Sequence, residues 1–71
     1  MSPLEQYITS KLEEARASNF EAIIIAFESH CMGAVEICTK LFPDQEKEII
    51  GKWNMEWHPK FVQEIYRVRG A

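Results

Sequence analysis

The chain has 71 residues, of which 46% are apolar and 27% charged, and its net charge is −3 at pH 7. That apolar fraction is typical of a folded domain and excludes a disordered chain, and the length allows a single domain, residues 1–71. The acidic balance makes nucleic acid an unfavoured partner, because phosphate-binding surfaces carry an excess of Lys and Arg. A chain this short buries only about 60% of its unfolded surface, so oligomerisation is a common source of additional stability.

The sequence favours a cytoplasmic protein without membrane contact. Its start lacks the basic and apolar regions of a signal peptide, and its longest uninterrupted apolar run, 22–27, is far shorter than a membrane span of ~20 residues. Cys31 and Cys38 cannot bridge within one helix, because seven residues at ~1.5 Å place them roughly 10 Å apart. A reducing compartment is the simplest expectation for two unpaired cysteines.

The first predicted helix covers residues 3–17. Ser2 is a suitable N-cap, Pro3 stands at the first helical position and Glu5 completes a capping box.

The second predicted helix is the long central one, residues 19–42. Ser18 and Glu21 form another capping box, with Asn19 as an alternative cap, and Pro43 ends the helix. Gly33 weakens the helix interior by about 1 kcal/mol relative to alanine, so it indicates a bend or the close approach of another helix.

Two further helices are predicted at 44–57 and 59–69. Asp44 would cap the first of them, and His58-Pro59 would separate the two. The alternation of Ile65 to Arg69 also fits a short strand. The preferred fold is an all-α bundle, with one long central helix and three shorter helices packed against it.

A heptad-like seam runs along the central helix. Its members are spaced 4, 3, 4, 3, 4, 3, as in coiled coils; they are Phe20, Ile24, Phe27, Cys31, Ala34, Cys38 and Leu41. Small residues in the middle and large ones at the ends indicate two helices that cross near Ala34. We predict that this seam is the interface of a homodimer.

The alternatives to a dimer are that the chain's own helices cover the seam, or that a different protein does. A second stripe of Ile23, His30 and Ile37 widens the apolar face, while Ile25 and Met32 lie on the far side of the helix. A helix that is apolar around its circumference is normally buried, and two-fold dimers are the commonest oligomers.

Aromatic residues gather towards the end of the chain. Trp53 and Trp57 are four residues apart and share a helix face. One interpretation makes them core residues. The other makes them part of a partner-binding surface, since Trp, Tyr and Arg are enriched in binding hot spots; the predicted surface consists of Trp53, Trp57, Tyr66, Arg67 and Arg69.

No motif specifies a reaction. His30, Cys31, Cys38 and His58 lack the close ligand spacing of zinc sites, and the sequence has no phosphate loop or nucleophile elbow. We therefore predict no catalytic, metal or cofactor site.

The predicted function is a non-enzymatic helical interaction module, an adaptor or an inhibitor that binds a protein partner and forms a homodimer. The rival hypothesis is a DNA-binding regulator, in which residues 44–69 form a helix-turn-helix whose last helix exposes Lys60, Gln63 and the two arginines.

Overall fold

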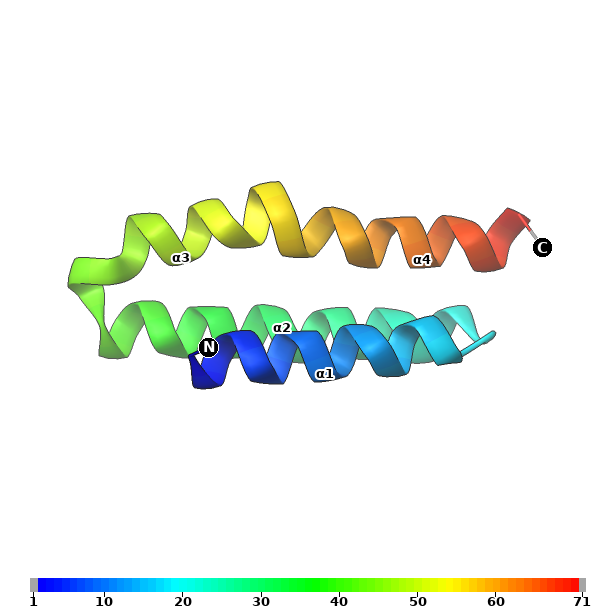
Figure 1. Cartoon of the computed structure of the whole chain (residues 1–71), viewed down its shortest axis with the longest axis horizontal. Coiled ribbons are helices and arrows are strands. Elements are labelled where there is room, and N and C mark those ends of the chain that lie inside the picture. The colour runs from blue at the N-terminus through cyan, green and yellow to red at the C-terminus, as the bar shows by residue number, and fades with distance from the viewer. Residues whose placement is uncertain (1, 71) are drawn as a thin grey trace.

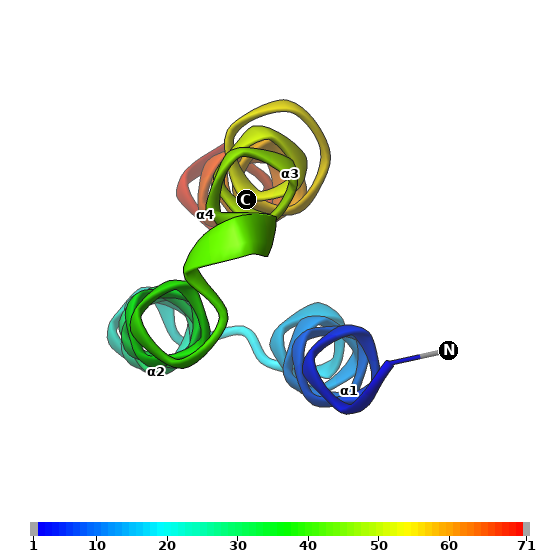
Figure 2. The ribbon, with the colours of Figure 1, turned by 90° about the vertical axis from the view of Figure 1, so that its left-hand side faces the viewer.

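The computed structural model describes residues 2–70 and consists of three antiparallel rods (Figure 1). The first rod is α1, Pro3–Ala17, and the second is α2, Glu21–Leu41. The third rod runs from Glu46 to Gly70. Viewed along the long axis, the rods occupy the corners of a triangle (Figure 2). The prediction of an all-α fold is confirmed for the described residues, and the segment considered as a strand is helical.

The predicted bounds of α1 are confirmed. The Oγ of Ser2 accepts a hydrogen bond from the backbone N–H of Glu5 at 3.2 Å, and Pro3 occupies the first helical position. Here the missing N–H of proline leaves no helical bond unmade.

The capping box predicted for α2 is wrong. Ser18 ends α1 instead: its N–H donates to the carbonyl of Ala15, and its Oγ accepts from the N–H of Phe20. α2 therefore starts at Glu21, two residues later than predicted, with Phe20 in the N-cap position and no side chain capping it. The reason is that a serine hydroxyl can bond to the backbone of a local turn instead of capping a helix, and here the Oγ of Ser18 is used in that way.

Asp44 is not the cap of the next helix. Residues Pro43–Gln45 form a 3-10 turn, and α3, Glu46–Lys52, follows it directly with Gln45 in the N-cap position. Pro43 ends α2 as predicted, since α2 stops at Leu41 and Phe42 leaves the helical conformation.

The predicted break at His58-Pro59 is also wrong. α3 continues through a π-helical turn, Trp53–Trp57, into α4, His58–Gly70. The N–H of His58 donates to the carbonyl of Trp53, five residues back. A proline ring normally collides with the carbonyl four residues earlier. The wider turn before Pro59 accommodates the ring, so the rod continues without a break.

The core lies between the three rods. α1 contributes Ile8, Leu12 and Ala15, α2 contributes Ile24, Cys31 and Val35, and the third rod contributes Trp53, Trp57 and Phe61. At the edges of the core, Glu28 of α2 pairs with His58 at 3.1 Å, and Glu21 of α2 pairs with Arg69. The molecule is elongated, with extents of 41 × 19 × 18 Å.

Candidate functional site

The outward side of α2 exposes several large apolar side chains. Ile23, Ile37 and Leu41 have exposed fractions of 43%, 60% and 67%. Together with the exposed His30 they form one stripe, spaced 7, 7 and 4 residues apart, on the flank nearer α1. We call these four residues the α2 face. A contiguous exposed apolar patch on a folded protein often marks an interaction site.

The predicted dimer seam divides between core and surface. Ile24 and Cys31 are fully buried within the single chain, and Phe27 packs against the core. Ala34 and Cys38 are half-buried, whereas Phe20 and Leu41 are exposed. The deepest seam residues thus face α1 and α4, and the exposed stripe lies next to them on the same helix.

Gly33 lies on the outer side of α2, away from the other two rods. A Cβ added there would meet nothing within 4 Å. α2 continues without interruption through this position. The glycine therefore permits no close contact within the chain and produces no break, although it costs about 1 kcal/mol of helix stability relative to alanine.

The two tryptophans of the predicted partner-binding surface belong to the core. Trp53 and Trp57 are 7% and 6% exposed. The ring centroid of Trp53 lies 6.2 Å from that of Phe61, a spacing typical of packed aromatic pairs. Neither indole presents a surface to a partner in this fold.

The other members of that predicted surface lie at the end of α4. Tyr66 is 64% exposed. Arg67 contacts the connection between α1 and α2: its Nη2 donates to the carbonyls of Ala15, Arg16 and Ser18 at 3.3, 3.3 and 2.8 Å. Arg69 pairs with Glu21. The two arginines therefore bind the chain's own backbone and side chains, and Tyr66 alone of the five predicted residues is presented to solvent without such contacts.

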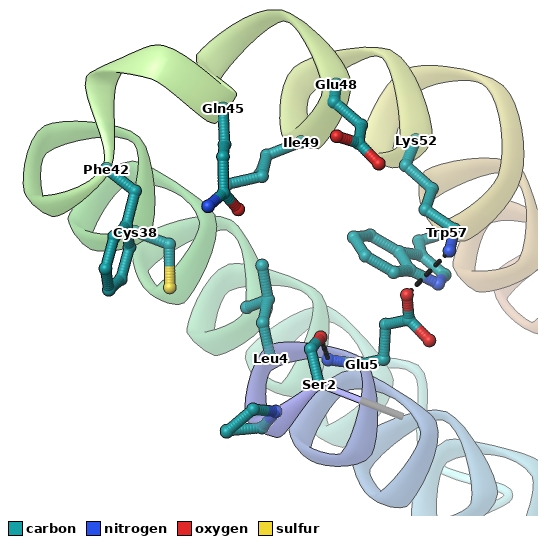
Figure 3. Close-up of a pocket in the computed structure, with 11 residues that line it drawn as sticks. Ser2, Leu4, Glu5, Cys38, Phe42, Gln45, Glu48, Ile49, Lys52 and Trp57 are labelled. Carbon is teal, nitrogen blue, oxygen red and sulfur yellow. Dashed lines mark hydrogen bonds and ion pairs between the residues drawn. The ribbon is translucent and has the colours of Figure 1, made fainter.

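A pocket of about 350 Å³ opens at the end of the bundle where α1 begins (Figure 3). α2 and α3 extend beyond the start of α1, which leaves the space between them uncovered (Figure 1). Its walls come from all three rods and consist of Ser2, Pro3, Leu4, Glu5, Cys38, Phe42, Gln45, Glu48, Ile49, Lys52 and Trp57. The sequence analysis did not predict this pocket, because no local pattern records how far one helix extends past another.

One ion pair crosses the pocket. The Nζ of Lys52 donates to Oε1 of Glu5 at 2.7 Å and lies 5.4 Å from the ring centroid of Trp57. The hydrogen bond from Lys52 lowers the pKa of the Glu5 carboxyl, and the same bond raises the pKa of the Lys52 ammonium. Both groups are therefore charged throughout the neutral range.

Replacing Glu5 with glutamine should lower the melting temperature more at pH 7 than at pH 3. Because folding lowers the pKa of Glu5, its contribution to stability is present above the unfolded value of 4.5 and is lost as the pH falls through the folded value. The check is a pair of thermal melts at each pH. Glu13→Gln, on an exposed position of the same helix, is the control, and equal losses for Glu5→Gln at both pH values would contradict the prediction.

Cys31 lacks the surroundings of a reactive thiol. Burial raises the pKa of the Cys31 thiol to about 11, so it stays protonated at neutral pH. Cys38 lines the pocket as a half-buried free thiol. Within residues 2–70, no three His, Cys, Asp or Glu side chains gather as a metal site would require.

By length and composition, α2 could also cross a membrane. The uninterrupted apolar runs of the sequence do not reveal this, because Glu28 and Glu36 divide the long apolar stretch of α2. A core helix of a water-soluble bundle has the same length and composition, so this property alone does not assign α2 to a membrane.

Comparison with known proteins found no match among protein-family models, curated proteins or solved structures.

Proposed function

We propose that this chain is a non-enzymatic helical interaction module that forms a homodimer through the α2 face. The observation that carries the proposal is the exposure of Ile37 and Leu41, at 60% and 67%, on α2. Apolar side chains at this spacing pack well against a second helix.

An antiparallel pair of α2 helices gives the α2 face a self-complementary register. When the two copies are centred on residue 32, Ile23 of one lies opposite Leu41 of the other, and Phe27 lies opposite Ile37. His30 then faces Ala34, which combines a large side chain with a small one. A two-fold axis requires this reciprocity. The contact from residue 23 to residue 41 would extend over about 27 Å of helix.

The dimer proposal retains part of the predicted seam. Phe27, Ala34 and Leu41 belong to both the seam and the register above. The side of the module opposite the dimer contact, with Tyr66 and Met55 exposed at 64% and 84%, is then available to the protein that the module serves as adaptor or inhibitor. The unbridged cysteines are consistent with a cytoplasmic location.

The continuous third rod weakens the argument for a DNA-binding regulator. A helix-turn-helix needs two helices joined by an angled turn, and residues 46–70 form one rod. DNA binding stays an untested prediction with no feature of the fold in its favour.

Light scattering behind size exclusion tests the dimer. We expect a mass of twice the 8.3 kDa chain, and we expect Ile37→Lys to reduce it to that of one chain, because the substitution places a charge in the middle of the α2 face. The matched control is Ile50→Lys, which changes an exposed isoleucine of α3 and should leave the mass doubled. A monomeric parent chain at all concentrations up to about 1 mM, where association would be worth only about 4 kcal/mol, would overturn the proposal.

A further inference from the structure

We infer that the pocket at the open end of the bundle binds a small molecule with an apolar body and one positive charge, an alkyl or aryl ammonium compound. None of the residues of the α2 face lines this pocket. The inference therefore stands apart from the proposed dimer, and each can fail without the other.

The size of the pocket fits a small ligand. Its volume of about 350 Å³ lies within the range of roughly 300–1,000 Å³ that ligand pockets occupy. The space exists because α1 starts partway along the other two rods (Figure 1). It is open at the end of the bundle, so a ligand can enter without moving a helix.

The walls suit an apolar body. Leu4 comes from α1, Cys38 and Phe42 from α2 and its C-cap, Ile49 from α3 and Trp57 from the π turn. Figure 3 shows Leu4, Ile49 and Trp57 directed into one space from different sides, with Cys38 and Phe42 at its edge. A hydrocarbon chain or ring placed between them would contact all three rods, and its burial would provide the main part of the affinity.

The charged side chains of the pocket favour a ligand that carries a positive charge. Lys52 and Glu5 neutralise one another through their 2.7 Å hydrogen bond. Glu48 also lines the pocket, its carboxylate points into it (Figure 3), and no cation in residues 2–70 lies within ion-pair distance of it. Glu48 also helps to raise the pKa of the Lys52 ammonium through space, so both carboxylates act on this one cation. The lining side chains carry two negative charges and one positive charge, and the excess negative charge attracts an ammonium group and repels a carboxylate.

Three probes that share one alkyl chain separate the contributions of the chain and of the charge. Octylammonium and octanoate are titrated into the protein below their micellar concentrations, and 1-octanol below its solubility limit. The shifts of amide and indole N–H groups are followed by NMR. We expect shifts at residues 2–5 and 42–52 and at the indole of Trp57, with octylammonium bound about two- to fivefold more tightly than octanol, as a partly exposed ion pair provides. Octanoate should bind most weakly.

The role of Glu48 is tested with Glu48→Gln, which should bind octylammonium and octanol equally. Glu46→Gln changes an exposed carboxylate on the same helix that does not line the pocket, and it should keep the preference. The inference is overturned if no probe shifts the pocket residues, if the shifts fall on the α2 face instead, if octanoate binds as tightly as octylammonium, or if both variants lose the preference equally.

Discussion

Replacing Phe61 with alanine is expected to lower the free energy of unfolding by about 3–5 kcal/mol. Phe61 is the largest fully buried side chain, and it belongs to the core that the three rods share. Its removal would leave a cavity that three short rods cannot close without losing other contacts. For a domain of this size the total stability is about 4–11 kcal/mol, so the variant should lose at least about a quarter of it.

Urea denaturation followed by circular dichroism measures this loss. Tyr66→Ala is the control, since it removes an aromatic ring from the same helix at a position that is 64% exposed; it should change the stability by no more than about 0.5 kcal/mol. The melting temperature of Phe61→Ala should fall by more than about 12 °C. Equal losses for the two variants would contradict the packing of α4 against the core.

The bounds of α1 and the end of α2 could be predicted from the sequence alone. The limits of α1 depend on Ser2 and Pro3, which act on the backbone within one helical turn and need no partner from elsewhere. Pro43 likewise ends α2 through its own ring. At these two places the predicted bounds were right to within two residues.

The faces of α2 were harder to predict, because the helix is apolar nearly all the way around. Periodicity placed Ile24 and Cys31 on one seam but could not decide which protein covers that seam. The structure buries both residues inside the single chain together with Val35, which the sequence analysis did not single out. The decision depends on where α1 and α4 pack, and this is a property of the whole fold.

The π turn could not be read from local patterns either. Pro59 predicts a break, and most helices do break there. The burial of Trp53 and Trp57 on both sides of the turn favours keeping the third rod continuous, because a bend between them would expose large aromatic surfaces. The cost of one widened turn is smaller than the loss of that burial.

The role of Arg67 was also missed. Its position near the end of the last helix suggested a favourable interaction with the helix dipole or the rim of a partner site, since nothing in the sequence relates residue 67 to residues 15–18. In the fold, α1 ends beside the end of α4. The guanidinium reaches the carbonyls of Ala15 and Arg16 in the last turn of α1 and that of Ser18 just after it, where the regular hydrogen bonds of the helix end.

Replacing Arg67 with methionine is therefore expected to lower the free energy of unfolding by about 1.5–3 kcal/mol, the range for hydrogen bonds that involve a charged group. Methionine keeps most of the aliphatic stem, so the loss reports the guanidinium. In the parent chain, the Nε of Arg67 also donates to Glu64 at 2.7 Å and its Nη1 donates to Asn19 at 3.4 Å. These bonds hold the guanidinium over the α1–α2 connection. Arg67→Lys should recover little, because a single ammonium cannot contact these acceptors together.

Arg69→Met is the matched control. Arg69 lies two residues further along the same helix and pairs with Glu21 on the surface, an interaction typically worth about 0.2–1 kcal/mol. Urea denaturation of the three variants measures the difference, and hydrogen exchange at residues 18–20 should quicken in Arg67→Met while it stays unchanged in Arg69→Met. If both methionine variants lose the same small amount of stability, Arg67 does not hold the end of α1 against α4, and the α1–α2 connection is fixed by the Ser18 hydrogen bonds alone.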